Sequence, residues 1–313
     1  MVNNCTPIKM KTLKKVKDYV CGFVLSVLFI WVGYLLCRLA WEGLVCKDSP
    51  VYGDLLIIVV GPASIALIGL GLYIVYMYFR DIYLLIRRKL SYGDYIKGTR
   101  EILERSKTEK EVYTTLVSGK EFVVYPNVFS PKYFNDTELF ADNLPIQEGE
   151  ELLEIGPGTG VISILMTYKG AKKVLAVDIN PDAVKNTQAN IVLHNVGDKV
   201  EVRQGDLYVP LRPDEKFDTI FWNTPFGFVE DKEIPDLEKA VYDPQYKSTE
   251  KFIKEAKLHL KENGRILIGF STTLGRLDLL QKFTTEAGLT LELIYEVASE
   301  EVHPVKFEIF EAK

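Results

Sequence analysis

A regular alternation of short apolar runs and amphipathic stretches begins at residue 151 and constrains the fold of this chain more than any other feature. The alternation predicts strands at 151–155, 173–178, 199–203, 217–221 and 264–270, and helices at 161–168, 181–194, 249–261 and 277–287. This order is typical of a parallel sheet with helices on both faces. Two further strand patterns, 290–296 and 305–311, have no helix between them and predict a closing hairpin with one antiparallel strand. The predicted fold class is α/β, with a seven-stranded, doubly wound, mostly parallel sheet.

Two long apolar runs precede this domain. Residues 19–41 contain one charged side chain, Arg38, and residues 55–79 contain none. A membrane-spanning helix needs about 20 apolar residues, so both runs are long enough. They predict a transmembrane helical hairpin. A cleaved signal peptide and a buried helical hairpin are the alternatives.

The charges that flank these runs predict the orientation of the hairpin. Five lysines precede the first run and four cations follow the second, whereas the segment 42–54 has only Lys47 against three acidic residues. Positively charged flanks stay on the cytosolic side. We therefore expect an integral membrane protein, anchored in the bilayer through residues 19–79, with both termini and the rear domain cytosolic.

These patterns together predict four segments along the chain. They are a basic cytosolic N-terminus at 1–18, two transmembrane helices at 19–80, a juxtamembrane connector at 81–120 and a folded domain at 121–313. An alternating pattern around Ser118-Gly119-Lys120 also predicts a β-hairpin at the end of the connector.

The charge and cysteine distribution limits the function of the rear domain. Residues 1–110 carry 16 Lys and Arg against 9 Asp and Glu, and the remaining residues carry 22 against 34, a net charge of −12. An acidic domain argues against nucleic acid as the partner. All four cysteines lie before residue 47, and the three histidines lack metal-ligand spacing, so we predict no metal site.

The residues at the predicted strand ends indicate a nucleotide-like ligand, because ligands of such sheets bind beyond the carboxyl ends of the strands. The first strand runs into "GPGTG", where glycines allow a tight turn and close backbone approach. A dinucleotide fingerprint would require a further glycine at position 161, which is Val161. The second strand ends in Asp178, whose carboxylate can accept hydrogen bonds from both hydroxyls of a ribose. Asp206 follows the third strand, where it could hold an adenine amine.

Four segments in order, "LLEIGPGTGVISI", "VLAVDINPDAV", "VRQGDLY" and "FDTIFWNTPFG", resemble the motifs of class I S-adenosylmethionine-dependent methyltransferases. The resemblance covers about residues 121–313 and implies S-adenosylmethionine as the cofactor. A structural glycine turn and a nicotinamide-binding domain are the alternatives. The cofactor-binding residues that the resemblance implies are Glu154, Gly156, Pro157, Gly158, Thr159, Gly160, Asp178, Ile179, Asp206, Leu207 and Asn223.

"NTPFG" resembles the Asn-Pro-Pro-Tyr/Phe motif of enzymes that methylate planar nitrogens, and so implies a catalytic role for residues 223–226. The side-chain oxygen of Asn223 and the backbone carbonyl of Thr224 would hold the hydrogens of the acceptor NH2 group. Pro225 would stiffen the turn, and Phe226 would stack on the planar acceptor. Thr224 stands where the motif has a proline, which predicts a less rigid turn. A simple strand-ending turn is the alternative.

The segment "VVYPNVFSPKYFNDTELFADNL" resembles the one before the glycine loop in release-factor glutamine methyltransferases and small methyltransferases, where it helps to cover the cofactor. Phe129, Pro131 and Thr137 match loosely, and a plain entry loop is the alternative. The predicted acceptor is a protein side-chain amide. An adenine amine, a small or lipid-soluble acceptor, and a cofactor-binding module without turnover stay open. The sequence does not indicate an oligomeric state.

Overall fold

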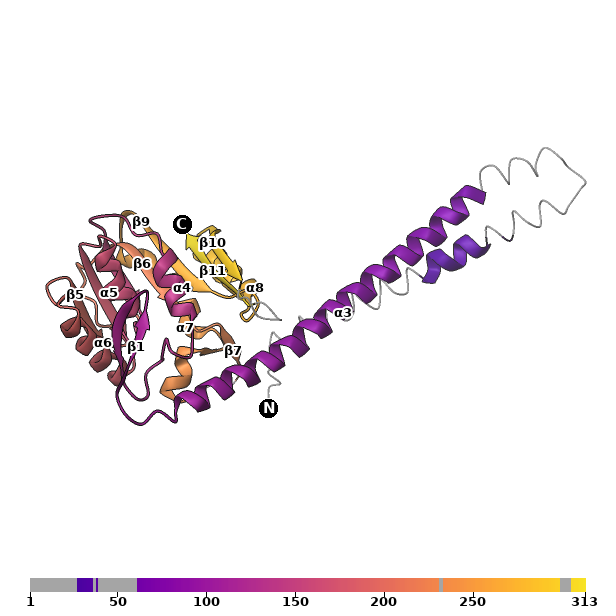
Figure 1. The fold of residues 1–313 in the computed structure, drawn as a ribbon. Coiled ribbons are helices and arrows are strands. Elements are labelled where there is room, and N and C mark those ends of the chain that lie inside the picture. The colour runs from indigo at the N-terminus through magenta and orange to yellow at the C-terminus, as the bar shows by residue number, and fades with distance from the viewer. Residues whose placement is uncertain (1–26, 36–37, 39–60, 231–232, 299–304) are drawn as a thin grey trace, which may run out of the picture. The chain divides into compact units, whose positions relative to one another are not determined.

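The structure is a computed structural model of the 313-residue chain. It describes residues 27–35, 38, 61–230, 233–298 and 305–313 (Figure 1). The chain divides into two compact units, Met1–Gly93 and Asp94–Lys313, and the helix α3 (Gly61–Ser106) contributes residues to both. The second unit therefore begins before residue 121, where the sequence placed the start of the folded domain.

The described residues include no helix that is long and apolar enough to cross a membrane. Most of the first predicted span, residues 19–41, and the first six residues of the second, 55–60, lie outside the described residues. The structure thus does not support the predicted transmembrane hairpin.

The second unit is built on a seven-stranded sheet with the order β10-β11-β9-β6-β3-β4-β5 (Figure 1). Its strands are β3 (Glu151–Ile155), β4 (Lys173–Asp178), β5 (Val200–Gln204), β6 (Phe217–Asn223), β9 (Leu260–Phe270), β10 (Leu291–Ala298) and β11 (Lys306–Ala312). β11 pairs antiparallel with both β10 and β9, and the remaining pairs of this sheet are parallel. The predicted sheet and its closing hairpin are confirmed.

The central strands are apolar because both of their faces are covered. Leu152, Leu153, Ile220 and Phe221 are fully buried. The helices around the sheet are α4 (Asp136–Asn143), α5 (Val161–Tyr168), α6 (Pro181–Leu193), α7 (Lys247–Ala256) and α8 (Leu277–Glu286), with a short 3-10 helix η3 (Lys257–His259) before β9. The helix predicted to reach residue 261 thus ends at Ala256, and β6 runs two residues further than predicted.

The predicted hairpin consists of β1 (Tyr113–Val117) and β2 (Lys120–Val124), joined by a two-residue turn with positive φ at Ser118 and Gly119. Two buried asparagines of α6, Asn186 and Asn190, form hydrogen bonds with the outer edge of β2. Asn190 Oδ1 accepts a hydrogen bond from Val123 N at 2.8 Å, and both asparagine amides donate to Val123 O. Asn186 Oδ1 likewise accepts from the backbone N–H of the residue after β2, at 2.8 Å. Side chains therefore supply the partners that a third strand would supply in a wider sheet.

A segment that the sequence left unassigned follows β6. Within it, β7 (Gly227–Val229) pairs in parallel with β8 (Tyr242–Pro244), and a 3-10 helix, η2 (Asp236–Ala240), lies between them. We call residues 233–248 the outer segment. Its Leu237 and Tyr242 are buried in a small cluster with Leu103, near the end of α3. The last turns of α3 therefore help to fix the outer segment.

Candidate active site

The carboxyl ends of β3, β4 and β6 open into a cavity of about 320 Å³. The outer segment forms its opposite wall through Leu237, Tyr242 and their neighbours. The predicted site residues that line the cavity are Glu154, Gly156, Pro157, Gly158, Thr159, Asp178, Ile179, Asp206, Leu207, Asn223 and Pro225. Gly160, Thr224 and Phe226 do not line it.

The glycine loop brings the main chain to the cavity wall. Gly156 has φ +63°, and a Cβ atom there would lie 3.1 Å from the Trp222 indole nitrogen. Gly160 has φ +80°, and a Cβ atom there would lie 2.9 Å from the Thr187 methyl group. The two glycines therefore have different functions: Gly156 lets the loop lie against the Trp222 indole, whereas Gly160 lets α5 pack against α6.

Asp178 is held rigidly at the end of β4. Its Oδ2 accepts a hydrogen bond from Gly158 N at 3.0 Å, and its Oδ1 accepts one from Asn180 N at 2.9 Å. A carboxylate has about four acceptor sites, so each oxygen retains one for a ligand. Burial raises the pKa of Asp178 to about 6. The geometry fits a carboxylate that accepts hydrogen bonds from a pair of vicinal hydroxyls.

Glu154, the second-last residue of the strand β3, is more deeply buried. It is 2% exposed, and the Ser163 hydroxyl donates a hydrogen bond to it. Burial raises the pKa of its carboxyl to about 7, and the nearby Asp178 adds to this effect. The Glu154 carboxyl therefore changes between its protonated and ionised forms near neutral pH.

This raised pKa predicts how the stability of the protein without cofactor depends on pH. The folded-state pKa lies above the unfolded value of 4.5, so folding takes up a proton between these values. The stability that protonated Glu154 contributes to the fold is fully present below about pH 4.5 and is lost as the pH rises through about 7. We expect Glu154→Gln, which keeps the size of the side chain, to be more stable than wild type at pH 8 by up to about 3 kcal/mol. The difference should shrink towards pH 5.

Denaturant unfolding of both proteins across this pH range measures the difference. Glu292→Gln, which replaces an exposed glutamate of β10, is the control and should leave the pH dependence unchanged. A pH-independent difference between wild type and Glu154→Gln would contradict the raised pKa.

Asp206 and Ile179 lie nearer to the surface at the cavity mouth. The Asp206 carboxylate is 49% exposed and forms an ion pair with Lys251 at 2.8 Å. The Ile179 side chain is 47% exposed, which leaves an apolar group free beside it. An acceptor oxygen next to an apolar surface suits an adenine ring, whose amine donates and whose faces are apolar. The residues present could therefore hold S-adenosylmethionine: Asp178 would bind its ribose and Asp206 its base.

Asn223 is the last residue of β6 and lines the cavity. Its Nδ2 donates a hydrogen bond to Asp136 Oδ2 at 3.0 Å. Its Oδ1 is buried and has no hydrogen-bond partner among the described residues. Buried polar atoms normally have partners, so an unpaired oxygen beside a ligand cavity indicates a donor that arrives with the ligand.

Thr224 fastens the motif to the neighbouring strand β9. Both its backbone N–H and its hydroxyl donate to Gly269 O, at 3.1 and 2.8 Å. A proline would have neither donor. The expectation that threonine loosens the turn is therefore wrong, because these two hydrogen bonds replace the rigidity of the ring.

We accordingly expect Thr224→Pro to destabilise the protein. Each lost hydrogen bond costs about 0.5–1.5 kcal/mol, and the restricted unfolded chain offsets up to about 1 kcal/mol of this. Thermal unfolding should show a Tm lower by roughly 2–6 °C. Thr224→Val keeps the N–H and removes only the hydroxyl, so its Tm should lie between the two. A proline variant with an unchanged or higher Tm would contradict the assignment.

Phe226 does not lie where its predicted function requires. Its ring is buried among aromatic side chains, edge-to-face with Phe270 at a centroid distance of 6.1 Å. Tyr246 Oη also donates to its backbone carbonyl. The ring therefore packs in the core beneath the turn and does not line the cavity. The aromatic side chains that line the cavity are Phe129, Trp222 and Tyr242.

Sequence reasoning missed Trp222, Asp136 and the outer segment as parts of the site. Trp222 had a usable signal, since it directly precedes "NTPFG", but the predicted strand stopped one residue earlier. Asp136 lies on α4, which was not predicted, and its partner Asn223 is 87 residues away.

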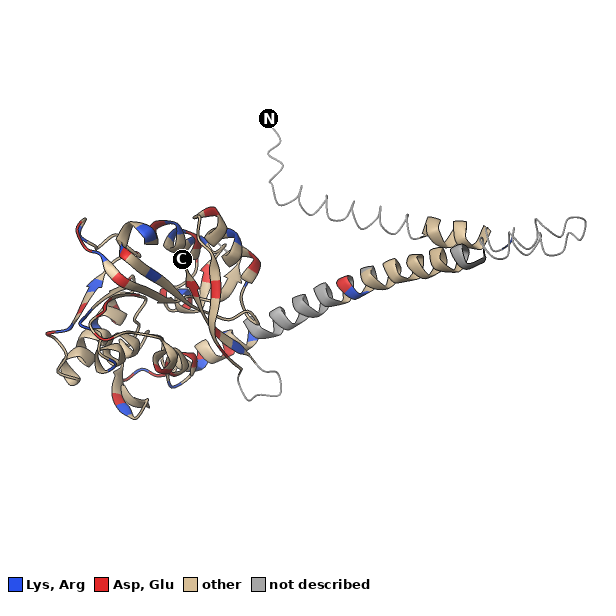
Figure 2. Cartoon of the chain, turned by 90° about the horizontal axis from the view of Figure 1, so that it is seen from above, with Lys and Arg blue, Asp and Glu red and all other residues tan. Residues whose placement is uncertain are grey.

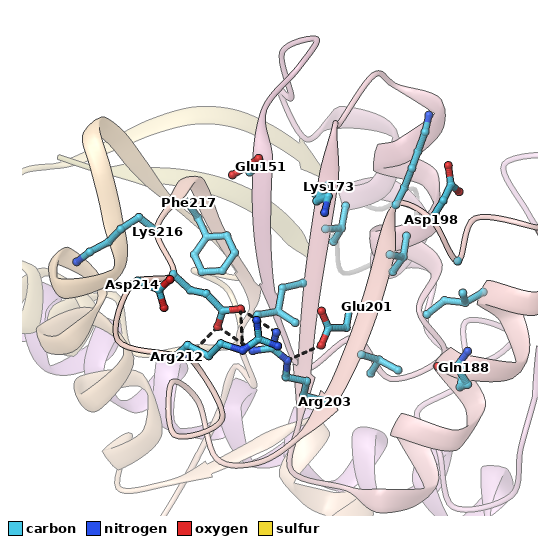
Figure 3. Close-up of a pocket in the computed structure, with 18 of the residues that line it drawn as sticks. Glu151, Lys173, Gln188, Asp198, Glu201, Arg203, Arg212, Asp214, Lys216 and Phe217 are labelled. Carbon is cyan, nitrogen blue, oxygen red and sulfur yellow. Dashed lines mark hydrogen bonds and ion pairs between the residues drawn. The ribbon is translucent and has the colours of Figure 1, made fainter.

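A second, larger hollow of about 720 Å³ lies at the other end of the strands (Figure 3). It is lined by the first residues of β4 and β6 and by a cluster of charges. Arg203 pairs there with Glu201 and Glu215, each at 2.7 Å. Because ligands of doubly wound sheets bind at the carboxyl ends, we take the smaller cavity as the candidate active site.

Comparison with known proteins identifies the family. Residues 119–292, more than half of the chain, match the family described as the methyltransferase small domain. The chain belongs to this family. It is an S-adenosylmethionine-dependent methyltransferase, and the class predicted from its motifs is confirmed.

Three relatives show the range of acceptors among similar proteins. A Methanocaldococcus jannaschii protein, provisionally named a protein N5-glutamine methyltransferase, is 33% identical over 189 residues, 58% of this chain and 93% of that protein. The release factor glutamine methyltransferase of Aquifex aeolicus is 32% identical over 52% of this chain and 63% of its own length. A tRNA1(Val) (adenine(37)-N6)-methyltransferase of Phocaeicola vulgatus is 29% identical over 40% of this chain and 52% of its own length.

Proposed function

We propose that the protein transfers a methyl group from S-adenosylmethionine to the side-chain amide nitrogen of a glutamine residue in a protein. The observation that carries the proposal is the Asn223 side chain, which lines the cavity and whose buried oxygen has no hydrogen-bond donor among the described residues. The names of two relatives that each match more than half of this chain favour glutamine over the other planar nitrogens. The acidic rear domain fits a protein acceptor better than a nucleic acid.

The chemistry of an amide explains why such an oxygen is needed. The nitrogen lone pair of an amide is delocalised into the carbonyl group, so the nitrogen is a poor nucleophile. An oxygen that accepts one N–H can turn the NH2 group so that the lone pair faces the methyl carbon. When bound, the cofactor supplies a methyl group on a positively charged sulfur, which keeps the electron pair of the broken carbon–sulfur bond. The acceptor nitrogen forms the new bond and loses one proton.

A labelling experiment tests the proposal. The full-length protein is incubated with S-adenosylmethionine carrying a labelled methyl group and with a peptide that has one glutamine. Matched peptides carry asparagine or glutamate at that position. We expect label only in the glutamine peptide, and we expect acid hydrolysis to release it as methylamine. Label in the glutamate peptide, released by mild base as methanol, would reject the amide acceptor.

Adenine is the second candidate acceptor, and the tRNA adenine methyltransferase among the relatives supports it. Charge argues against it. Lys, Arg, Asp and Glu are interspersed along the elements of the second unit (Figure 2), whereas nucleic-acid binders usually gather cations on one face. An adenine-containing oligonucleotide in the same assay decides between the two acceptors.

Attachment to a membrane is part of the proposal that rests on the sequence alone. The two apolar runs and their cationic flanks predict an anchor with the catalytic unit on the cytosolic side. We expect the full-length protein to stay in the membrane pellet after alkaline carbonate extraction. Protease added to the cytosolic side of sealed vesicles should digest residues 121–313. Full-length protein in the soluble fraction would reject the anchor.

A further inference from the structure

One buried contact joins the predicted catalytic amide to a carboxylate far from it in sequence. Asp136 is the first residue of α4, and it is 5% exposed. Its Oδ2 accepts the 3.0 Å hydrogen bond from Asn223 Nδ2. Its Oδ1, like that of Asn223, is buried and has no partner among the described residues.

A carboxylate in this place determines which way the asparagine amide faces. An ionised carboxylate only accepts hydrogen bonds, so it requires the NH2 group of Asn223 on its side. If the amide were turned the other way, the Asn223 oxygen would face the Asp136 carboxylate, and two acceptors would repel each other. The Asn223 oxygen therefore faces away from Asp136. Rotation of the amide would not give this oxygen a hydrogen-bond donor, because it would then face the carboxylate.

The oxygen is buried, and Gly269 lies next to it. Gly269 on β9 has no side chain, and a Cβ atom there would lie 3.3 Å from Asn223 Oδ1. The start of α4 also favours a negative charge at Asp136, since the free N–H groups of a helix N-terminus stabilise anions. Burial opposes this charge and raises the pKa of Asp136. A buried carboxylate with one oxygen left unpaired lowers the stability of the fold, so its presence needs an explanation other than stability.

We infer that Asp136 is a positioning residue: it holds the Asn223 amide with its oxygen free to accept a hydrogen from the nitrogen that becomes methylated. This inference rests on the proposed function, because it assigns a task to Asn223 in transfer to an NH2 group. Asp136 itself acts through Asn223 and does not exchange atoms with the substrate.

A double-mutant cycle on the full-length protein tests the inference. We expect Asp136→Ala to lower the single-turnover rate of transfer to the glutamine peptide by about a hundredfold, the scale of a misplaced reacting group. Asp136→Asn should recover much of the rate, since its side-chain oxygen can still accept from Asn223. In an Asn223→Ala background, Asp136→Ala should change the rate less than twofold. Asp142→Ala, an exposed carboxylate of the same helix, is the matched control.

The same cycle is measured by thermal unfolding without cofactor or acceptor. If the two side chains are partners, their Tm changes should be strongly non-additive. Additive Tm changes, or a full hundredfold loss of rate from Asp136→Ala in the Asn223→Ala background, would overturn the inference. So would a lowered Tm with an unchanged rate, which marks a purely structural contact.

The outcome separates this inference from the proposed function. A wild-type protein that labels the adenine oligonucleotide but not the glutamine peptide would reject glutamine as the acceptor. The cycle is then run with the oligonucleotide, whose amine is also a planar NH2 group. The thermal cycle needs no acceptor and gives the same answer in either case.

Discussion

Replacement of Asn223 by alanine is expected to lower the rate of methyl transfer by roughly a hundredfold or more, with little change in cofactor affinity. The amide oxygen is proposed to hold an acceptor hydrogen while the lone pair leaves conjugation. Such a contact strengthens as the reaction proceeds, so its loss raises the barrier more than it weakens binding. Removal of one preorganised polar group typically costs 10²- to 10³-fold.

Single-turnover transfer to the glutamine peptide measures this effect, and calorimetry measures cofactor binding. Asn143→Ala is the control, because the amide of Asn143 donates only to a backbone carbonyl within its own helix, α4. Thermal unfolding of each variant shows whether it is folded. A folded Asn223→Ala protein that transfers methyl at the wild-type rate would reject the planar-nitrogen mechanism. An oxygen, carbon or sulfur acceptor would then explain the site better.

The second large effect is expected at Asp178. Asp178→Asn should weaken S-adenosylmethionine binding by roughly 10- to 100-fold at pH 7.5, since a hydrogen bond to a charged group contributes about 1.5–3 kcal/mol. Gly158 N and Asn180 N now donate to different oxygens of the carboxylate, so the new NH2 group would also face one of these two N–H groups. Asp182→Asn, an exposed carboxylate of α6 paired with Lys185, is the control.

The pKa of Asp178, about 6, adds a pH test with a definite sign. Ribose hydroxyls donate to the ionised form, so wild-type affinity should be constant above about pH 7 and fall below pH 6. One unit below the pKa, about a tenth of the carboxyl remains ionised, so the affinity at pH 5 should be roughly tenfold lower. The affinity of the Asp182→Asn control should fall at low pH as it does in wild type, whereas the affinity of Asp178→Asn should not. Calorimetry at several pH values measures all three proteins. An unchanged affinity in folded Asp178→Asn would remove this residue from the site.

The sheet could be predicted because its signal is local and strong. Parallel strands covered on both faces appear in sequence as short apolar runs, and the glycines and aspartates that follow them mark their carboxyl ends. Gly156, Asp178 and Asn223 were assigned to one cavity on this basis, and the structure brings them together. The class of enzyme followed from the same residues.

The parts that could not be predicted depend on contacts between distant residues. The outer segment has short elements with no clear period, and it is fixed by packing against Leu103 of α3. Phe226 was predicted to stack on the acceptor, whereas its ring is buried in the core, because a residue type does not tell whether a turn side chain faces a ligand or the core. The prediction for Thr224 considered only that threonine lacks the ring of proline. The hydrogen-bond partner of Thr224, the carbonyl of Gly269, lies 45 residues further along the chain.

The asparagines that hold β2 have a consequence for the order of events during synthesis. Val123 leaves the ribosome 67 residues before Asn190, the side chain that satisfies its backbone N–H. At about 5–20 residues per second, the outer edge of the new hairpin stays unpaired for roughly 3–13 s. An open strand edge is a template for pairing with other chains. The hairpin edge of the nascent protein is therefore open to pairing with other chains in the interval between translation of β2 and translation of α6.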